Sequence, residues 1–131
     1  MVEFALVLPV LLLILIAIMK FGLMFNRYIT LTDAVRSGAR QLALGRGLTD
    51  PCTPARQQTA TAAGALNLNP LTQVTATLTF PDACGNGTSG ANMIQGDQAK
   101  ITATYPCDLS VMGINFLPNC TLSASATEAI E

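Results

Sequence analysis

A charge-free run of apolar residues near the N-terminus constrains this chain more than any other feature. From Phe4 to Met19 the sequence reads FALVLPVLLLILIAIM, and the apolar character continues past Lys20 to about Phe25. About 20 apolar residues in a helix suffice to cross a bilayer. A single lysine near the end is tolerated because its aliphatic stem carries the ammonium to the interface. The run therefore predicts a membrane-spanning helix.

A cleaved secretory signal is the main alternative to a membrane span. Such a signal needs a basic segment before its apolar core and small residues at a cleavage site after it. The sequence starts Met-Val-Glu, with an acid and no base, and Lys-Phe-Gly-Leu-Met follows the core. Neither flank fits, so we interpret the segment as a retained helix.

The charges and the cysteines make opposite predictions about orientation. Five cations follow the apolar run, which by the positive-inside rule keeps the rest of the chain in the cytoplasm: Lys20, Arg27, Arg36, Arg40 and Arg46. Four cysteines in a small Thr-, Ser- and Gly-rich region instead indicate disulfides and export. The two predictions about orientation agree if a short basic leader precedes Met1 and is removed. N-terminal sequencing of the protein, compared with the full reading frame, tests this hypothesis.

The helical pattern continues beyond the apolar run. Apolar and small residues recur every three or four positions, at Ile29, Leu31, Ala34, Val35, Gly38, Ala39 and Leu42. Gly45 and Gly47 are stop signals, which predicts a helix to about Leu44, apolar all round at first and amphipathic later. Pro9 lacks an N–H and predicts a kink or a locally loosened helix. The small residues permit close packing, either within the chain or against another copy.

Residues 47–131 predict a small head domain, separate from the helical unit of residues 1–46. We expect Thr53 to cap a second helix that begins at Pro54 and runs to about Leu68. Three later stretches alternate apolar and hydroxyl residues, at 74–80, 100–105 and 121–127. They predict an antiparallel sheet whose apolar face covers the amphipathic half of the long helix, an α+β and pilin-like architecture.

Two connections between these strands differ in composition. Pro81–Gln98 is rich in Gly, Asn and Asp, which predicts an exposed loop. The stretch between the second and third strands is instead apolar, with Val111, Met112, Ile114, Phe116 and Leu117. It is either core beneath the sheet or a contact patch for a neighbouring chain, and the sequence leaves both open.

The four cysteines allow three disulfide pairings. We favour Cys107–Cys120, which brackets the apolar connection, and Cys52–Cys84, which ties the second helix to the exit of the first strand. Zinc binding is the competing interpretation, but no Cys-x-x-Cys spacing occurs. A count of free thiols under denaturing conditions separates the two.

The composition argues against catalysis and nucleic-acid binding. The chain has no His, and its 8 acidic residues are scattered singly. A Ser-His or Cys-His nucleophile therefore cannot be built, and no carboxylate cluster replaces it. A net charge of −1 offers no basic patch for a phosphate backbone. We predict no enzyme, no cofactor, no metal and no nucleic-acid partner.

The first 44 residues closely resemble the N-terminal signature of TadE/TadG-like pilins, the tight-adherence (Tad) branch of the type IV pilin superfamily. The matching pieces are Val2–Pro9, Phe21-Gly22 and Ala34–Arg40. The resemblance is specific because an acid at the head of an apolar helix is rare. This family is often acidic near the Phe-Gly pair, whereas this chain has Lys20 there.

The resemblance implies a set of partners and assembly residues. A prepilin peptidase would cleave a leader a few residues before Glu3, and inner-membrane pilus assembly machinery would extract the helix into a homopolymer. Glu3, Phe4 and Pro9 are the implied assembly residues, and Glu3 matches the acid that pairs with a neighbour's N-terminal amine. Such a pair is physically reasonable because a carboxylate in an apolar core needs a cation. The alternative places Glu3 among lipid headgroups.

The resemblance also implies a function. The leading prediction is a structural subunit of an extracellular Tad pilus filament, which serves adhesion and surface colonisation. The alternatives are a minor or tip pilin that primes assembly, and a membrane-anchored binding domain that never polymerises. The chain is expected in the bacterial inner membrane before assembly and in a cell-surface filament afterwards.

Overall fold

A computed structural model of the chain describes residues 2–78, 84, 93–107, 110–111, 114–115 and 119–131. The two helices are α1 (Val2–Ala43) and α2 (Cys52–Ala62), and a 3-10 turn, η1 (Gly64–Leu66), follows α2. The strands are β1 (Val74–Leu78), β2 (Gln98–Pro106), β3 (Ser110–Val111), β4 (Ile114–Asn115) and β5 (Thr121–Ala129).

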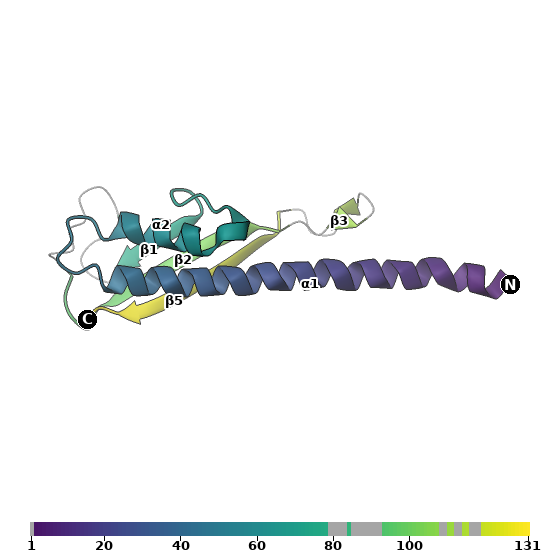
Figure 1. Ribbon diagram of the computed structural model, residues 1–131, viewed down its shortest axis with the longest axis horizontal. Coiled ribbons are helices and arrows are strands. Elements are labelled where there is room, and N and C mark those ends of the chain that lie inside the picture. The colour runs from purple at the N-terminus through teal and green to yellow at the C-terminus, as the bar shows by residue number, and fades with distance from the viewer. Residues whose placement is uncertain (1, 79–83, 85–92, 108–109, 112–113, 116–118) are drawn as a thin grey trace.

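The long helix α1 dominates the shape of the molecule. Its 42 residues make it about 63 Å long. Figure 1 shows that its C-terminal half lies against the head, whereas its N-terminal half projects beyond it. The helix continues through Pro9, and the ribbon shows no sharp kink there, the first of the two expected outcomes. It ends at Ala43, one residue before the predicted end.

The head contains the predicted antiparallel sheet, in the order β1-β2-β5. Ala76 pairs with Ile101, and Ile101 pairs with Ala126. Alternate residues of β1 and β2 are buried, in agreement with the period-two pattern: Val74, Ala76, Leu78, Ala99, Ile101 and Ala103. The long N-terminal helix and the three-stranded sheet together confirm the predicted α+β, pilin-like fold.

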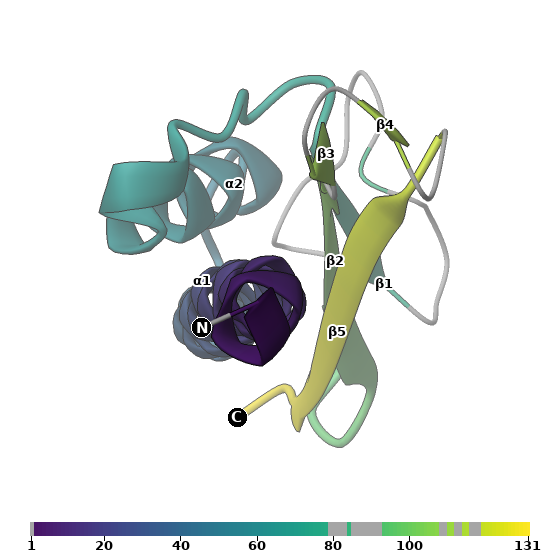
Figure 2. The same cartoon turned by 90° about the vertical axis from the view of Figure 1, so that its right-hand side faces the viewer.

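The second half of α1 packs against both parts of the head. Seen along its axis in Figure 2, α1 lies below α2 and to the left of the sheet. Leu31, Val35 and Leu42 are fully buried in this core, together with Ile101 of β2. Gly38 of α1 faces α2, because a Cβ atom added to it would lie 1.8 Å from Thr59 Oγ1, and Ala34 and Ala39 are buried. Ala34, Gly38 and Ala39 therefore serve packing within the chain.

The second helix begins and ends differently from the prediction. It starts at Cys52 after the N-cap residue Pro51, and Asp50, not Thr53, supplies the capping side chain, because the Asp50 carboxylate accepts the backbone N–H groups of Cys52 and Thr53. The α-helix ends at Ala62, well before Leu68. Gly64 follows with φ +34°, a backbone conformation that interrupts an α-helix, and Asn67 closes η1 in the left-handed region.

The two predicted connections are described only in part. Phe80, most of the predicted loop, and Met112, Phe116 and Leu117 lie outside the described residues. Within the loop, Met93 is buried, contrary to the expected exposure, and Gln98 already belongs to β2. β3 and β4 pair as a separate hairpin, which Figure 1 shows beyond the end of the three-stranded sheet.

Candidate functional site

The most unusual surface of the molecule is the projecting half of α1, here defined as residues 4–29. Phe4 and Leu6 are each 73% exposed. Large apolar side chains are exposed around the whole helix, including Leu11, Leu12, Leu13, Ile14, Leu15, Ile18, Met19, Phe21, Leu23, Phe25 and Ile29. A soluble protein does not leave so large an apolar surface uncovered, so a membrane or another protein covers it.

By length and composition, α1 qualifies as a membrane span. The candidate span covers Leu6–Ala43. It contains an 18-residue window with a mean hydropathy of 2.7, and none of that window is buried inside the molecule. The helix therefore fits anchoring in a membrane. The exposed apolar surface does not end at Lys20, however. Phe21 and Phe25 beyond it are 68% and 65% exposed.

The three predicted assembly residues lie at the far end of this surface. Glu3 is in the first turn of α1, next to the exposed Phe4. Pro9 is exposed about one and a half turns further along. The structure thus collects these residues at the free tip of the helix, away from the head.

A small pocket marks the junction between the head and the projecting half of α1. Its volume is about 90 Å³, and its lining residues are Lys20, Leu23, Met24, Arg27, Cys107 and Leu122. The Arg27 guanidinium carbon lies 5.9 Å from the centre of the Tyr105 ring, within cation–π range. Lys20 is thereby half-buried against the head, in addition to lying near the end of the predicted span.

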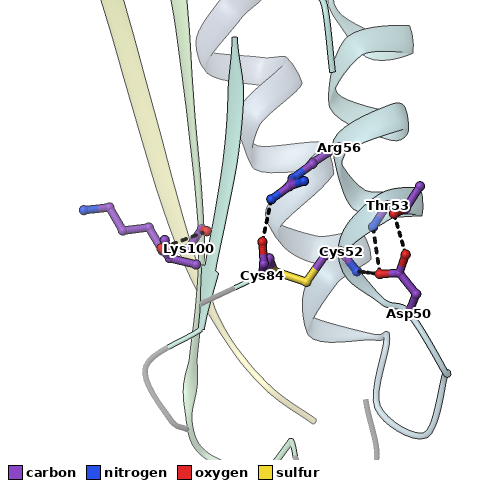
Figure 3. Close-up of a disulfide and its surroundings, with 7 residues drawn as sticks. Asp50, Cys52, Thr53, Arg56, Cys84 and Lys100 are labelled. Carbon is purple, nitrogen blue, oxygen red and sulfur yellow. Dashed lines mark hydrogen bonds between the residues drawn. A yellow bond between two sulfur atoms is a disulfide. The ribbon is translucent and has the colours of Figure 1, made fainter. Parts of the chain in front are cut away.

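Two disulfides brace the head, in the pairing favoured from the sequence. Cys52–Cys84 joins the start of α2 to the segment after β1, and Cys107–Cys120 joins the end of β2 to the residue before β5. Figure 3 shows that Arg56 adds to the first cross-link by donating from Nη2 to the Cys84 carbonyl oxygen, at 2.9 Å. No cysteine among the described residues is free, which leaves no thiolate for zinc.

The Asp50 carboxylate holds the start of α2. The Thr53 hydroxyl and the Thr53 and Cys52 backbone N–H groups all donate to the Asp50 carboxylate (Figure 3). The Thr53 side-chain hydrogen bond is the main reason why the pKa of Asp50 lies below its ordinary value, and the backbone bonds act in the same direction. Asp50 therefore stays ionised and holds the start of α2 beside the first disulfide.

Sequence reasoning missed three of these contacts. Both Asp50 and Thr53 are good capping residues, so composition alone did not decide between them. The contact of Arg56 with Cys84 and the shared pocket of Lys20 and Arg27 depend on tertiary structure. The seven-residue spacing of Lys20 and Arg27, which puts both on one helical face, was the available signal for the second.

Within the described ranges, no group of three or more His, Cys, Asp or Glu residues lies close enough to hold a metal ion. The pocket at the junction holds two cations and no described acid, so it offers no acid–base pair.

A long helix, apolar in its exposed half and packed in its other half against a small antiparallel sheet, defines a pilin-like class of protein. Residues 1–40 match the family described as TadE-like protein, which confirms the resemblance seen in the sequence. No significant match was found among curated proteins or among solved structures. The chain therefore carries a TadE-like N-terminal segment, which indicates a Tad pilus-associated protein.

Proposed function

We propose that this chain is a structural subunit of an extracellular Tad pilus filament that serves adhesion and surface colonisation. The observation that carries the proposal is the exposed apolar surface of the projecting half of α1, which continues beyond Lys20 toward the head. The TadE-like match over residues 1–40 supports the same function.

The length of this surface favours a filament over a lone anchor. Residues 4–29 extend for about 39 Å along the helix axis, whereas the hydrocarbon core of a bilayer is about 30 Å thick. In a lone anchor, Lys20 at the interface would leave Phe21 and Phe25 in the headgroup region or in water. Packing against the helices of other copies covers them, and burial of each such side chain contributes roughly 1.5–3 kcal/mol.

The continuity of α1 suits transfer from a membrane to a filament. One unbroken helix runs from the apolar tip into the core of the head, with no linker between anchor and head. A force applied to the head therefore displaces the apolar half of α1 together with the head, because one rigid helix joins them. Inner-membrane assembly machinery and a prepilin peptidase are the partners that such a transfer requires.

The test is to shear cells that express the full chain and to follow the protein into filaments by sedimentation and electron microscopy. We expect long filaments composed mainly of this chain. Trace amounts within filaments of another protein would instead identify a minor or tip pilin. Recovery only with membranes would identify an anchored binding domain and refute the proposal.

Two sets of variants sharpen this test. Phe21→Ser with Phe25→Ser removes apolar surface beyond Lys20 and should abolish filaments while the chain still inserts in the membrane. Leu71→Ser is the matched control, because Leu71 is an apolar residue of the head with 78% exposure. Glu3→Ala should also block assembly, with both head disulfides still formed. Normal filaments from this variant would contradict an assembly role for Glu3.

A further inference from the structure

When α1 is anchored in a membrane, the head meets the helix at the depth where the hydrocarbon ends. Counted from Phe4, the first residue of the charge-free run, a hydrocarbon core about 30 Å thick takes about 20 residues of an upright helix and ends near Leu23. Leu23 and Met24 line the junction pocket together with Cys107 and Leu122 of the head. The end of the sheet that carries Cys107 and Leu122 therefore lies at the edge of the hydrocarbon core.

Two cations of α1 lie on either side of this edge. Lys20 is three residues before Leu23, so its aliphatic stem carries the ammonium outward, and Arg27 is four residues after it, about 6 Å outside the hydrocarbon. The headgroup layer is about 5–8 Å thick, so each cation reaches it through its own contact. Neither pairs with an acid that the structure describes, since the one ion pair among the described residues joins Arg36 to Asp33.

The described acids of the head lie at its opposite end. They are Asp50, Asp97, Glu128 and Glu131. Glu128 and Glu131 line a second pocket with Arg40, about 20 Å beyond Arg27 along α1. The Asp97 carbonyl oxygen accepts the N–H of Ile130, between those two acids, and Asp50 caps α2 just after α1 ends. The end of the head nearest the lipid therefore carries no negative charge among the residues that the structure describes.

Both tyrosines of the chain lie at the same level, and the chain contains no tryptophan. Tyr28 follows Arg27 in α1 and is 41% exposed, and the Tyr105 ring centre lies 5.9 Å from the Arg27 guanidinium carbon. Helical side chains tilt toward the N-terminus of their helix, so Arg27 and Tyr28 reach back toward the membrane. Tyrosine concentrates at membrane interfaces because its ring is apolar and its hydroxyl is hydrated.

The segment closed by Cys107–Cys120 extends this end of the head. Between the two cysteines the sequence is rich in large apolar residues and has a single charged one, Asp108, which lies outside the described residues. The strands β3 and β4 within it form a hairpin that Figure 1 shows beyond the end of the sheet, in the direction of the projecting half of α1. In Figure 2 the hairpin lies to one side of α1. The hairpin is therefore on the membrane side of the head.

We propose that this end of the head binds the surface of the membrane that anchors α1, and that it prefers membranes rich in anionic phospholipids. Lys20 and Arg27 contact headgroup phosphates, the two tyrosines lie among the headgroups, and the Cys107–Cys120 hairpin enters the interface. Each cation near an anionic surface favours the bound head by roughly fivefold. The inference rests on the membrane anchor and concerns the chain before assembly, so it does not depend on whether the chain forms filaments.

Hydrogen exchange of the full chain in vesicles tests the proposal. The chain, with both disulfides intact, is reconstituted at low density into vesicles of phosphatidylcholine alone or mixed with phosphatidylglycerol, and amide exchange in residues 105–122 is followed by mass spectrometry. We expect exchange to be several-fold slower in the anionic vesicles. Salt at 1 M should remove the difference, because the Debye length falls to about 3 Å. Equal exchange in the two kinds of vesicle at low salt would overturn the proposal.

Two double variants with the same net charge assign the effect to the junction. Lys20→Gln with Arg27→Gln should bring exchange in anionic vesicles to within about twofold of that in neutral ones. Arg46→Gln with Lys100→Gln is the matched control, because both residues are exposed away from the junction, and it should keep the slow exchange. Loss of slow exchange in the control would refute the proposal. Protection that rises with protein density in neutral vesicles would also refute it, because a second copy would then cover the hairpin.

Discussion

Gly38→Ala is expected to destabilise the head, although alanine is the better helix former. Gly38 lies where α1 crosses α2, and its added Cβ would lie 1.8 Å from Thr59 Oγ1 and 3.2 Å from the Ala55 carbonyl oxygen. Thr59 is fully buried, and its hydroxyl donates to the Ala55 carbonyl oxygen at 2.8 Å. The β-branched side chain has little freedom to turn away, so the two helices must separate.

The magnitude follows from two opposing contributions. Overpacking a closely packed site costs about 1–3 kcal/mol, and the short contact with Thr59 places this site near the upper end. Replacing glycine by alanine inside a helix returns about 1 kcal/mol. The net loss in unfolding free energy is therefore about 2 kcal/mol. In a Thr59→Ala background the short contact disappears, and Gly38→Ala should become neutral or stabilising by up to about 1 kcal/mol.

Thermal unfolding of the full chain in mild detergent, with both disulfides intact, measures all four members of this double-mutant cycle. A destabilisation of 1 kcal/mol lowers the midpoint by roughly 4–8 °C in a domain of this size. Gly22→Ala is the matched control, because no atom lies within 4 Å of a Cβ added there. Equal effects of Gly38→Ala in both backgrounds would refute the close approach of α1 to α2.

Three further predictions concern the head. Removing Cys52–Cys84, whose cysteines have a sequence separation of 32, should cost about 4 kcal/mol, and removing Cys107–Cys120, with a separation of 13, should cost about 3 kcal/mol. Urea denaturation should therefore rank the first cross-link as the stronger. Asp50→Ala should destabilise α2 by about 0.5–2 kcal/mol through loss of the cap, whereas Thr53→Ala, which keeps both backbone bonds to Asp50, should cost less. The pKa of Asp50 is lowered in the folded state, so the carboxylate contributes to the stability of the folded head at neutral pH, and this contribution is lost as the pH falls below about 3.8 toward the folded-state pKa. Asp50→Asn should abolish this part of the acid sensitivity. An unchanged acid profile in this variant would contradict the cap.

Local periodicity accounts for the parts of the fold that the sequence predicted well. Val74, Ala76 and Leu78 alternate with threonines, and a strand with that pattern has one buried face whatever it pairs with. In the same way, apolar positions at three- and four-residue spacing predict the buried face of α1 around Leu31 and Val35. These features depend on near neighbours in the chain.

The errors concern contacts between distant segments or competition between near-equivalent residues. Asp50 and Thr53 are both capping residues, and the outcome depends on the turn that presents the Asp50 carboxylate to Cys52. Met93 was placed in an exposed loop because of its polar neighbours, yet it is buried in the core. Lys20 was expected to reach toward an interface, and its approach to Leu122 depends on how the sheet lies along α1. The division of the chain at residues 46 and 47 stays a prediction.

Electron cryo-microscopy of filaments sheared from cells and purified with their disulfides intact tests the central claim most directly. We predict a core made of the projecting halves of many α1 helices and a surface made of the heads. A core that excludes residues 4–29, or preparations in which the chain is recovered only as a lipid-bound monomer with reduced cysteines, would contradict the account.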